Sequence, residues 1–340
     1  MTPRDKETPP GGSDRPGQAN DRDAVDRVGR LRQARAMTSV ESAAAGRIVV
    51  GFDGSDHAQR AVEWAAVEAL SRGVGLFIVS AFTPPASGST FGFGAYLSPD
   101  ALDDMSERMS KDLAAYADTV RAAHPGLDVT ADVVMGSPTT ALIEASDDAV
   151  LTVVGSRGLG GFRGLLLGSV GVNVAANAHG PVVVLRKDAP ADAKTIVVGV
   201  DGSDLSDQAV DFAFDMASRH GWSLRAIHAW EVPSYDVLAA PMGPPPMSID
   251  DFGEAEARMP AEALAGHRER YPDVPVEVRV VRGTPARAIL DNAKDAAMIA
   301  VGSRGRGEFM GAMLGSVGQG VLFKAKVPVA VIGGGDEEED

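Results

Sequence analysis

The chain has 340 residues, of which 44% are hydrophobic and only 5% aromatic, enough for two mostly aliphatic cores of ordinary domain size. Its formal net charge of −15 excludes a general nucleic-acid-binding protein, which needs a basic face, and its lack of cysteine excludes disulfides and thiolate metal sites. No apolar run has membrane-spanning length or the form of a secretory signal, so we expect a soluble cytoplasmic protein that has no membrane partner.

The first 45 residues are polar and rich in Pro, Gly, Asp and Arg, and we expect them to form a disordered N-terminal extension. Within this extension, Asp21–Ala36 has apolar residues at helical spacing, so a helix that docks on the domain or on a partner stays open as an alternative. Met37 is a second candidate translation start, which leaves open whether residues 1–36 are translated.

From Arg47 onward, short apolar strands alternate with segments that have helical periodicity. The turn Asp53–Asp56 offers Ser55 or Asp56 as the N-cap of the first helix. The expected elements of this first repeat are the strand Arg47–Phe52, the helix Ala58–Arg72, the strand Gly75–Ala81, the helix Asp100–His124, the strand Leu127–Met135, the helix Pro138–Asp147, the strand Val150–Val154, the helix Ser169–Ala178 and the strand Pro181–Arg186.

The same series begins again after a short linker. Asp201–Asp204 repeats the sequence of Asp53–Asp56 at an offset of 148 residues, and Gly302 repeats Gly155 at an offset of 147. A near-constant offset over a whole β/α series indicates a duplicated domain rather than a short solenoid repeat. The expected elements of the second repeat include the strands Ile196–Val200, Ser223–Trp230, Val276–Arg282, Ala297–Val301 and Val327–Ile332, the long helix Asp250–Tyr271 and a Pro-rich insertion, Glu231–Ile249.

Alternation of strands and helices predicts an α/β fold, in which right-handed crossovers place helices on both faces of a parallel sheet. The last strand of each repeat, Pro181–Arg186 or Val327–Ile332, would be an adhesive sheet edge if left open, so we expect these two strands to pair. The expected division is a disordered extension over 1–45, a first domain over 46–187, a linker over 188–194, a second domain over 195–333 and an acidic tail over 334–340.

Two glycine-rich loops carry the clearest functional signal. Gly155–Gly171 and Gly302–Gly318 are identical at 12 of 17 positions, and each follows a strand and precedes a helix. Glycines let backbone N–H groups approach a phosphate, and the helix N-terminus adds a partial positive charge. A structural turn is the alternative interpretation of one such loop, but the duplication favours an anion site.

A carboxylate is expected opposite each glycine loop. Ligands of open α/β sheets lie beyond the carboxyl ends of the strands, where the strand order reverses. Asp53 and Asp201 end the first strand of each repeat, and Gly155 and Gly302 end the fourth. A carboxylate beside a phosphate cradle suits a nucleoside, although Asp53 alone could cap the following helix. The P-loop, dinucleotide and protein-kinase signatures are absent from the sequence.

Both loops have the pattern Gly-x2-Gly-x9-Gly-Ser, and both repeats begin with Gly-x-Asp-Gly-Ser. With these motifs, the chain resembles the universal stress protein family, in its tandem two-domain form of actinobacteria, over about Arg47–Arg186 and Thr195–Ile332. The glycine pattern is similar to that of the ATP-binding branch. The resemblance implies two tandem Rossmann-like domains of the adenine nucleotide alpha hydrolase-like type, each with a five-stranded parallel sheet and helices on both faces.

The resemblance also implies a role for each matching residue. Asp53 and Asp201 would hold the adenosine end, and the backbone of Ala81 and Ala229 would meet the adenine. The ribose and phosphate side of the loop would be shaped by Gly155, Arg157, Gly158, Gly302, Arg304 and Gly305, with a solvated position of the two arginines as the alternative. The phosphates would bind at the helix entry, formed by Gly168, Ser169, Val170, Gly315, Ser316 and Val317.

The expected ligand is ATP, accompanied by Mg²⁺ in many family members; no residue cluster in the sequence predicts a protein-ligated metal. We expect a nucleotide-dependent stress-response regulator that forms a homodimer and acts on an unidentified regulatory protein partner. A slow ATPase or phosphotransferase is the alternative, because the loops lack the lysine and paired carboxylates of fast phosphoryl transfer. A scaffold with empty sites is a third hypothesis, against which the intact glycine motifs count.

Overall fold

A computed structural model describes residues 40–83, 99–158, 167–231, 256–305 and 314–333. The first 39 residues of the predicted extension and the predicted acidic tail lie outside these ranges, as do parts of both glycine loops. None of the helices within these ranges is long and apolar enough to span a membrane.

The first domain follows the predicted order of elements. The side chain of Ser55 caps α2 by accepting a hydrogen bond from the backbone N–H of Ala58, and Gly73 ends that helix in the left-handed conformation, with φ of 67°. The elements are β1 (Ile48–Gly51), α2 (Asp56–Arg72), β2 (Leu76–Phe82), α3 (Pro99–Ala123), β3 (Val129–Met135), α4 (Pro138–Ala145), β4 (Leu151–Gly155), α5 (Ser169–Asn177) and β5 (Pro181–Leu185).

The second domain repeats this order. Ser203 and Gly221 delimit its first helix in the same way, and the helix predicted over Asp250–Tyr271 is present as α9, with residues up to 255 outside the described ranges. The elements are β6 (Thr195–Gly199), α6 (Asp204–His220), β7 (Ser223–Trp230), α9 (Arg258–Arg270), β8 (Val276–Arg282), α10 (Pro285–Asp291), β9 (Met298–Gly302), α11 (Ser316–Lys324) and β10 (Val329–Ile332).

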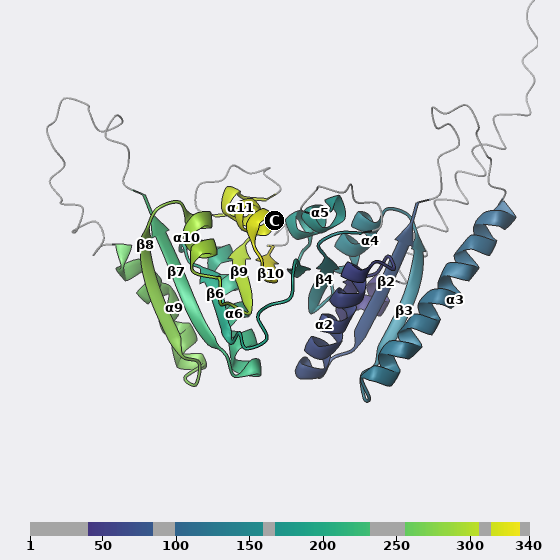
Figure 1. The fold of residues 1–340 in the computed structure, drawn as a ribbon, viewed down its shortest axis with the longest axis horizontal. Coiled ribbons are helices and arrows are strands. Elements are labelled where there is room, and N and C mark those ends of the chain that lie inside the picture. The colour runs from purple at the N-terminus through teal and green to yellow at the C-terminus, as the bar shows by residue number, and fades with distance from the viewer. Residues whose placement is uncertain (1–39, 84–98, 159–166, 232–255, 306–313, 334–340) are drawn as a thin grey trace, which may run out of the picture.

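The strands of the described ranges form one continuous sheet of ten, in the order β3-β2-β1-β4-β5-β10-β9-β6-β7-β8. Neighbouring strands within each domain are parallel, whereas β5 and β10 pair antiparallel, with Val184 opposite Val329. The predicted pairing of the two final strands is therefore confirmed. It places the domains side by side, with the paired strands at the centre of the molecule (Figure 1).

Helices cover both faces of this sheet, so each domain has three layers (Figure 1). The side chains of a strand alternate between two apolar cores. Ile48 and Val50 lie in the core formed with α2, α3, α6 and α9, while Val49 between them lies in the core formed with α4, α5, α10 and α11. Both cores are aliphatic and rich in alanine, as the composition predicts.

The predicted disorder up to residue 45 is wrong for the last part of the extension. Residues 40–44 are helical. The side chains of Val40 and Ala44, one helical turn apart, are buried in the core that contains α4 and α5. The backbone N–H of Gly46 then donates to the carbonyl of Asp148 at 2.9 Å. A single i, i+4 apolar pair among small residues gives too short a pattern to predict such a turn.

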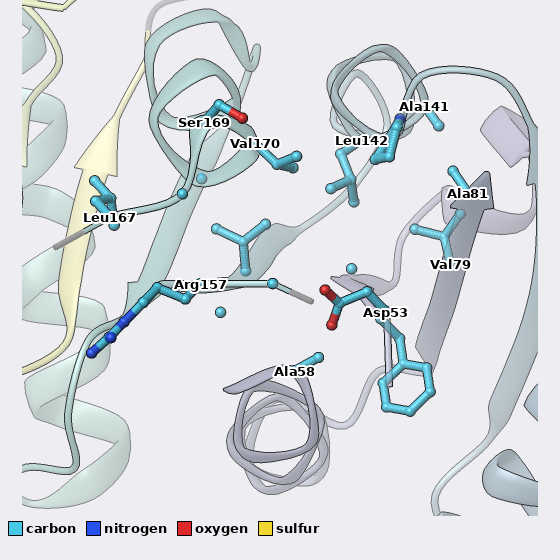
Figure 2. Close-up of a pocket in the computed structure, with 18 residues that line it drawn as sticks. Asp53, Ala58, Val79, Ala81, Ala141, Leu142, Arg157, Leu167, Ser169 and Val170 are labelled. Atoms are coloured by element: carbon cyan, nitrogen blue, oxygen red, sulfur yellow. The ribbon is translucent and has the colours of Figure 1, made fainter. Parts of the chain in front are cut away.

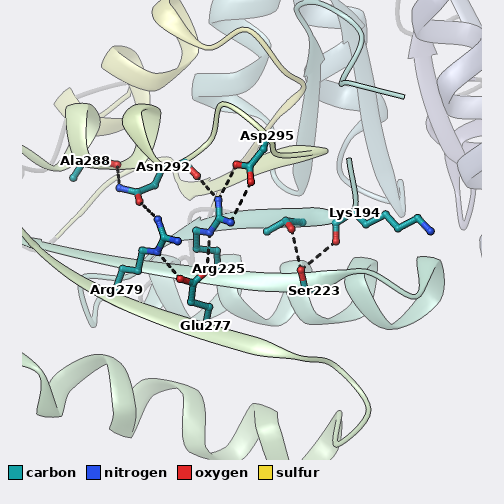
Figure 3. A network of polar contacts seen from close by, with 9 residues as sticks. Lys194, Ser223, Arg225, Glu277, Arg279, Ala288, Asn292 and Asp295 are labelled. Atoms are coloured by element: carbon teal, nitrogen blue, oxygen red, sulfur yellow. Dashed lines mark hydrogen bonds and ion pairs between the residues drawn. The ribbon is translucent and has the colours of Figure 1, made fainter. Parts of the chain in front are cut away.

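The second domain carries charges where the first has an aromatic side chain. Arg225 on β7 occupies the register position that buried Phe77 occupies on β2. Its guanidinium donates to Glu277 at 2.9 Å and to Asp295 at 2.8 Å (Figure 3). Hydrogen bonds from Arg279 and from Arg225 lower the pKa of Glu277. Paired charges thus replace apolar packing on this part of the second sheet half.

A charge cluster connects the two domains between α2 and α6. The carboxylate of Glu68, with 2% of its surface exposed, accepts a hydrogen bond from Nε of Arg72 and contacts Nε2 of His220 at 2.8 Å. The guanidinium of Arg72 also contacts Asp215 at 3.0 Å. We call these four residues the interdomain charge cluster. A buried carboxylate is tolerated only where such partners compensate its lost hydration.

A second contact between the domains lies at the end of β5. The guanidinium of Arg186 donates to the carbonyl of Phe323 at 3.0 Å and to that of Ala325 at 3.3 Å. These carbonyls belong to the C-terminal end of α11, where the helix dipole favours a cation. Burial, followed by repulsion from Arg157, lowers the pKa of Arg186. The end of the first domain is thereby fixed to the last helix of the second.

Candidate functional site

A cavity lies in each domain at the point where the strand order reverses. In the first domain, β1 stands between β2 and β4, and a cavity of about 570 Å³ is lined by residues at the ends of β1 and β4 and at the start of α5. In the second domain, a cavity of about 280 Å³ is lined by residues at the ends of β6 and β9 and at the start of α11. We call these cavities the first site and the second site. Reversal points of this kind are where open α/β sheets bind ligands.

The structure brings together every residue that the sequence assigns to a binding role. The predicted residues that line the first site are Asp53, Ala81, Gly155, Arg157, Gly158, Gly168, Ser169 and Val170. The predicted residues that line the second site are Asp201, Ala229, Gly302, Arg304, Gly305, Gly315, Ser316 and Val317. Each set therefore borders one continuous space.

At the glycines that begin each loop, the loop backbone lies closer to neighbouring atoms than a residue with a Cβ would allow. A Cβ at Gly158 would lie 2.3 Å from Oδ2 of Asp53, and a Cβ at Gly155 would lie 2.9 Å from the backbone of His57. At Gly305 the corresponding distance, to Oδ2 of Asp201, is 2.6 Å. Neither Gly158 nor Gly305 has a positive φ, so these positions need glycine because of space and not because of backbone conformation.

The helices α5 and α11 begin at the cavities without side-chain caps. Their N-cap residues are Gly168 and Gly315, and the first turn of neither described helix contains an acidic residue. The helices α2 and α6 differ, because Ser55 and Ser203 cap them and each has aspartate in its first turn. The partial positive charge of α5 and of α11 is thus offset by neither a capping side chain nor an acidic residue of the first turn, which suits an anion in the cavity.

The carboxylate of Asp53 points into the first site, toward the end of the glycine loop (Figure 2). One of its oxygens accepts a hydrogen bond from the backbone N–H of Ser55 at 3.0 Å, an arrangement made possible by the positive φ of 84° at Gly54. The N-cap of α2 is Ser55, so the alternative that Asp53 caps this helix is wrong. Its carboxylate instead closes the turn and faces the cavity.

The guanidinium of Arg157 points away from the first site, although its backbone lines the cavity (Figure 2). It lies close enough to His57 and Arg186 to affect both. The pKa of His57 is lowered by partial burial, then by repulsion from Arg60 and Arg157, so this imidazole is neutral near pH 7. The side-chain position of Arg157 agrees with the solvated alternative, and its loop backbone is the part that faces a ligand.

Sequence reasoning missed the apolar wall of each site. In the first site this wall consists of Val79, Ala141 and Leu142, which lie on the side of the cavity away from Ser169 (Figure 2). They stem from β2 and α4, where the pattern predicts buried core residues. Core packing and cavity lining require the same side chains, so hydrophobic periodicity does not distinguish them. The available signal was the position of Val79 on β2, three residues before the carboxyl end of the strand.

Comparison with known proteins agrees with the duplicated fold. Residues 45–186 and 193–333 each match the sequence profile of the Universal stress protein family. A universal stress protein of Mycolicibacterium smegmatis is 37% identical over 300 residues, covering 86% of this chain and 99% of the relative. One of Mycobacterium tuberculosis strain H37Rv is 38% identical over 294 residues, covering 84% and 95%.

Among solved structures, a universal stress protein from Archaeoglobus fulgidus aligns with a TM-score of 0.63 at 24% sequence identity. The alignment covers 84% of this chain and 98% of that protein, so the similarity extends over both domains.

Proposed function

The chain belongs to the universal stress protein family, and we propose that it binds one adenine nucleotide in each domain and acts as a nucleotide-dependent stress-response regulator. The observation that carries this proposal is a combination found twice. An uncapped helix N-terminus, a glycine loop and an aspartate border one cavity at each reversal of strand order. A structural turn would need the glycines but neither the cavity nor the exposed dipole.

The residues around the first site fit the parts of a nucleotide. Backbone N–H groups at Gly168, Ser169 and Val170 would bind phosphates at the start of α5. The carboxylate of Asp53 would accept hydrogen bonds from ribose hydroxyls. The apolar wall around Val79 would pack against the base. In the second site, equivalent residues would contact the phosphates, the ribose and the base in the same way.

ATP is the proposed ligand, and Mg²⁺ would accompany it on the phosphates. This ion keeps several waters and commonly binds through phosphates with one or two carboxylates. Throughout the described ranges, no group of three or more His, Cys, Asp or Glu residues could hold a metal ion. The protein would therefore contribute to the ion chiefly by positioning the phosphates at α5 and α11.

The proposed output is a change of assembly or partner with nucleotide occupancy. Mass spectrometry of ligand released from protein purified without added ATP tests binding, and adenine nucleotide is the expected ligand. Light scattering of the full chain with and without ATP then tests the proposed homodimer. Protein that neither retains nor binds ATP, ADP or AMP would refute the proposal. A turnover rate typical of a kinase, instead of slow or absent hydrolysis, would favour an enzyme.

A further inference from the structure

The two sites differ on the wall opposite the glycine loops. The helix-entry glycines and serines are the same in both, as are the loop glycines and the aspartate. Four other lining residues change between equivalent positions. Phe52, Ala58, Val79 and Leu142 of the first site correspond to Val200, Ser206, Ile227 and Ile289 of the second. The cavity falls from about 570 Å³ to about 280 Å³. Cavities that enclose small molecules measure about 300–1,000 Å³.

The exchange of Val79 for Ile227 narrows the end that would hold the base. Both side chains are almost fully buried, with 3% and 1% of their surfaces exposed. The added methylene of the isoleucine therefore takes its room from the cavity or from the core. Because protein interiors are packed as densely as crystals, the core has little room for the added methylene. The Ile227 side chain therefore extends into the cavity and makes it smaller. One methylene in an apolar pocket changes affinity by about 10–200-fold.

The exchange of Ala58 for Ser206 fixes the loop that carries the aspartate. The hydroxyl of Ser206 accepts from the backbone N–H of Asp201 at 3.1 Å and donates to the carbonyl of Gly199 at 3.3 Å. Alanine cannot make either bond. In addition, Oδ1 of Asp201 accepts both the N–H of Ser203 at 2.9 Å and its hydroxyl at 2.7 Å. In the first domain, the hydroxyl of Ser55 donates to the carbonyl of Arg157 at 3.5 Å.

The second site is therefore smaller, and Ser206 ties its aspartate loop to the end of β6. Resting on the proposed nucleotide binding, we infer that the two sites are not equivalent. The first site is the high-affinity site for adenine nucleotide, and the second site binds the same ligand at least about tenfold more weakly. The residues that set this difference are Val79 and Ile227 at the base wall.

The positive charge near the first site also favours tighter nucleotide binding there than at the second site. Arg60 contacts the imidazole of His57, beside the first site, and Arg186 lies close enough to Arg157 to repel it while donating to the end of α11. Their equivalents in the second domain are Gln208 and Gly333. Two additional cations raise the local potential for a polyphosphate, an effect that salt screens over a Debye length of about 8 Å at physiological ionic strength.

The test uses reciprocal exchanges in the full chain, measured by isothermal titration with ATP. Gly305→Val silences the second site and Gly158→Val silences the first, since the larger side chain enters the cradle. In the Gly305→Val chain, Val79→Ile should weaken ATP binding at the first site about tenfold. In the Gly158→Val chain, Ile227→Val should tighten ATP binding at the second site by a similar factor. Unchanged affinities in both backgrounds would overturn the inference. If a silenced chain fails to fold, the wild type supplies the same test, because its isotherm should show two affinities and Val79→Ile should merge them.

The outcomes separate this inference from the proposed function. If both sites bind ATP with equal affinity, the chain is a nucleotide-binding protein but the inference is wrong. If neither site binds any adenine nucleotide, the proposed function fails first. Raised ionic strength gives an independent readout, because it should reduce the ratio of the two affinities more for ATP than for adenosine. An equal effect on both ligands would contradict the charge difference between the sites.

Discussion

At the scale of single residues, each site depends on glycines, which lack a Cβ atom and a capping side chain. Gly158 and Gly305 leave space that a Cβ would take from the carboxylate opposite, and the glycine N-caps leave the starts of α5 and α11 without a capping side chain. These features were predictable, because glycine spacing is visible in the sequence. The direction of the Arg157 side chain was not, since it depends on contacts with residues distant in the chain.

Substitution of the cradle glycines should weaken nucleotide binding. Gly158→Ala should reduce affinity at the first site at least about tenfold, or ~1.4 kcal/mol, because the new Cβ would lie 2.3 Å from Oδ2 of Asp53. Gly305→Ala should act likewise at the second site. Isothermal titration with ATP measures both effects. The double variant has to lose affinity at both sites; full retention would mean that the close contact of loop glycine and aspartate is not part of the nucleotide site.

The matched control for these variants is Gly266→Ala. Gly266 lies inside α9, and a Cβ there would meet nothing within 4 Å. Alanine should leave nucleotide affinity unchanged and stabilise the chain by up to about 1 kcal/mol, as expected in a helix interior.

The carboxyl of Glu144 should make stability depend on pH. Its pKa is raised, first by partial burial and then by repulsion from Glu41 and Asp147. A carboxyl whose pKa is higher in the folded than in the unfolded state favours folding at low pH, and this advantage is lost as the pH rises through the folded pKa. Glu144→Gln should therefore gain stability over the wild type at pH 7 but not at pH 4.

Urea denaturation at both pH values measures this difference. Glu107→Gln serves as the control of opposite sign, because a hydrogen bond from Lys111 lowers the pKa of Glu107. A Glu144→Gln variant with the same advantage at both pH values would show that the charge of Glu144 does not matter.

At the scale of helices and strands, the duplicated pattern was sufficient to predict nearly every element. Buried parallel strands such as β4 and β9 are continuous apolar runs, and serine caps mark where α2 and α6 begin. The turn at 40–44 escaped prediction because its burial depends on a tertiary contact with the first domain. The charged substitute for Phe77 in the second domain, Arg225, likewise has no local signature.

Truncation should locate the true start of the first domain. Removing residues 1–36 should leave folding and nucleotide binding unchanged. Removing residues 1–45 should lower the melting temperature by several degrees, because it uncovers the surface that Val40 and Ala44 bury. Melting of both truncated chains, with and without ATP, tests this boundary. Equal melting temperatures would show that the turn is dispensable.

A point variant isolates the same contact. Val40→Ala should cost about 1.5 kcal/mol, since Val40 is 1% exposed and loses two buried carbon atoms. The matched control is Val67→Ala on α2, where the side chain is 50% exposed and the change should stay within about 0.5 kcal/mol. Equal effects of the two variants in urea denaturation would contradict the packing of this turn.

At the scale of the whole molecule, the paired strands β5 and β10 join two domains into one sheet, and the interdomain charge cluster ties α2 to α6. Both of these helices begin at a site, through Ala58 and Ser206, and end at the shared cluster. The strand pairing was predictable from two short apolar edges. The cluster was not, because it joins residues far apart in the chain, such as Glu68 and His220.

Breaking the interdomain charge cluster should destabilise the chain. Arg72→Ala removes the main partner of the buried Glu68 carboxylate and should cost about 3 kcal/mol or more. The control is Arg219→Ala, which removes a more exposed pair with Asp215 and should cost less than about 1 kcal/mol. Urea denaturation measures both, and similar small costs would mean that the cluster does not hold the domains together.

The number of nucleotides bound per chain is the decisive measurement for the proposed nucleotide binding. Isothermal titration of the full chain with ATP, carried to saturation of the weaker site, should give a stoichiometry near two, because both repeats present the same cradle, helix entry and aspartate. A stoichiometry near zero for ATP, ADP and AMP alike would contradict nucleotide binding by this chain.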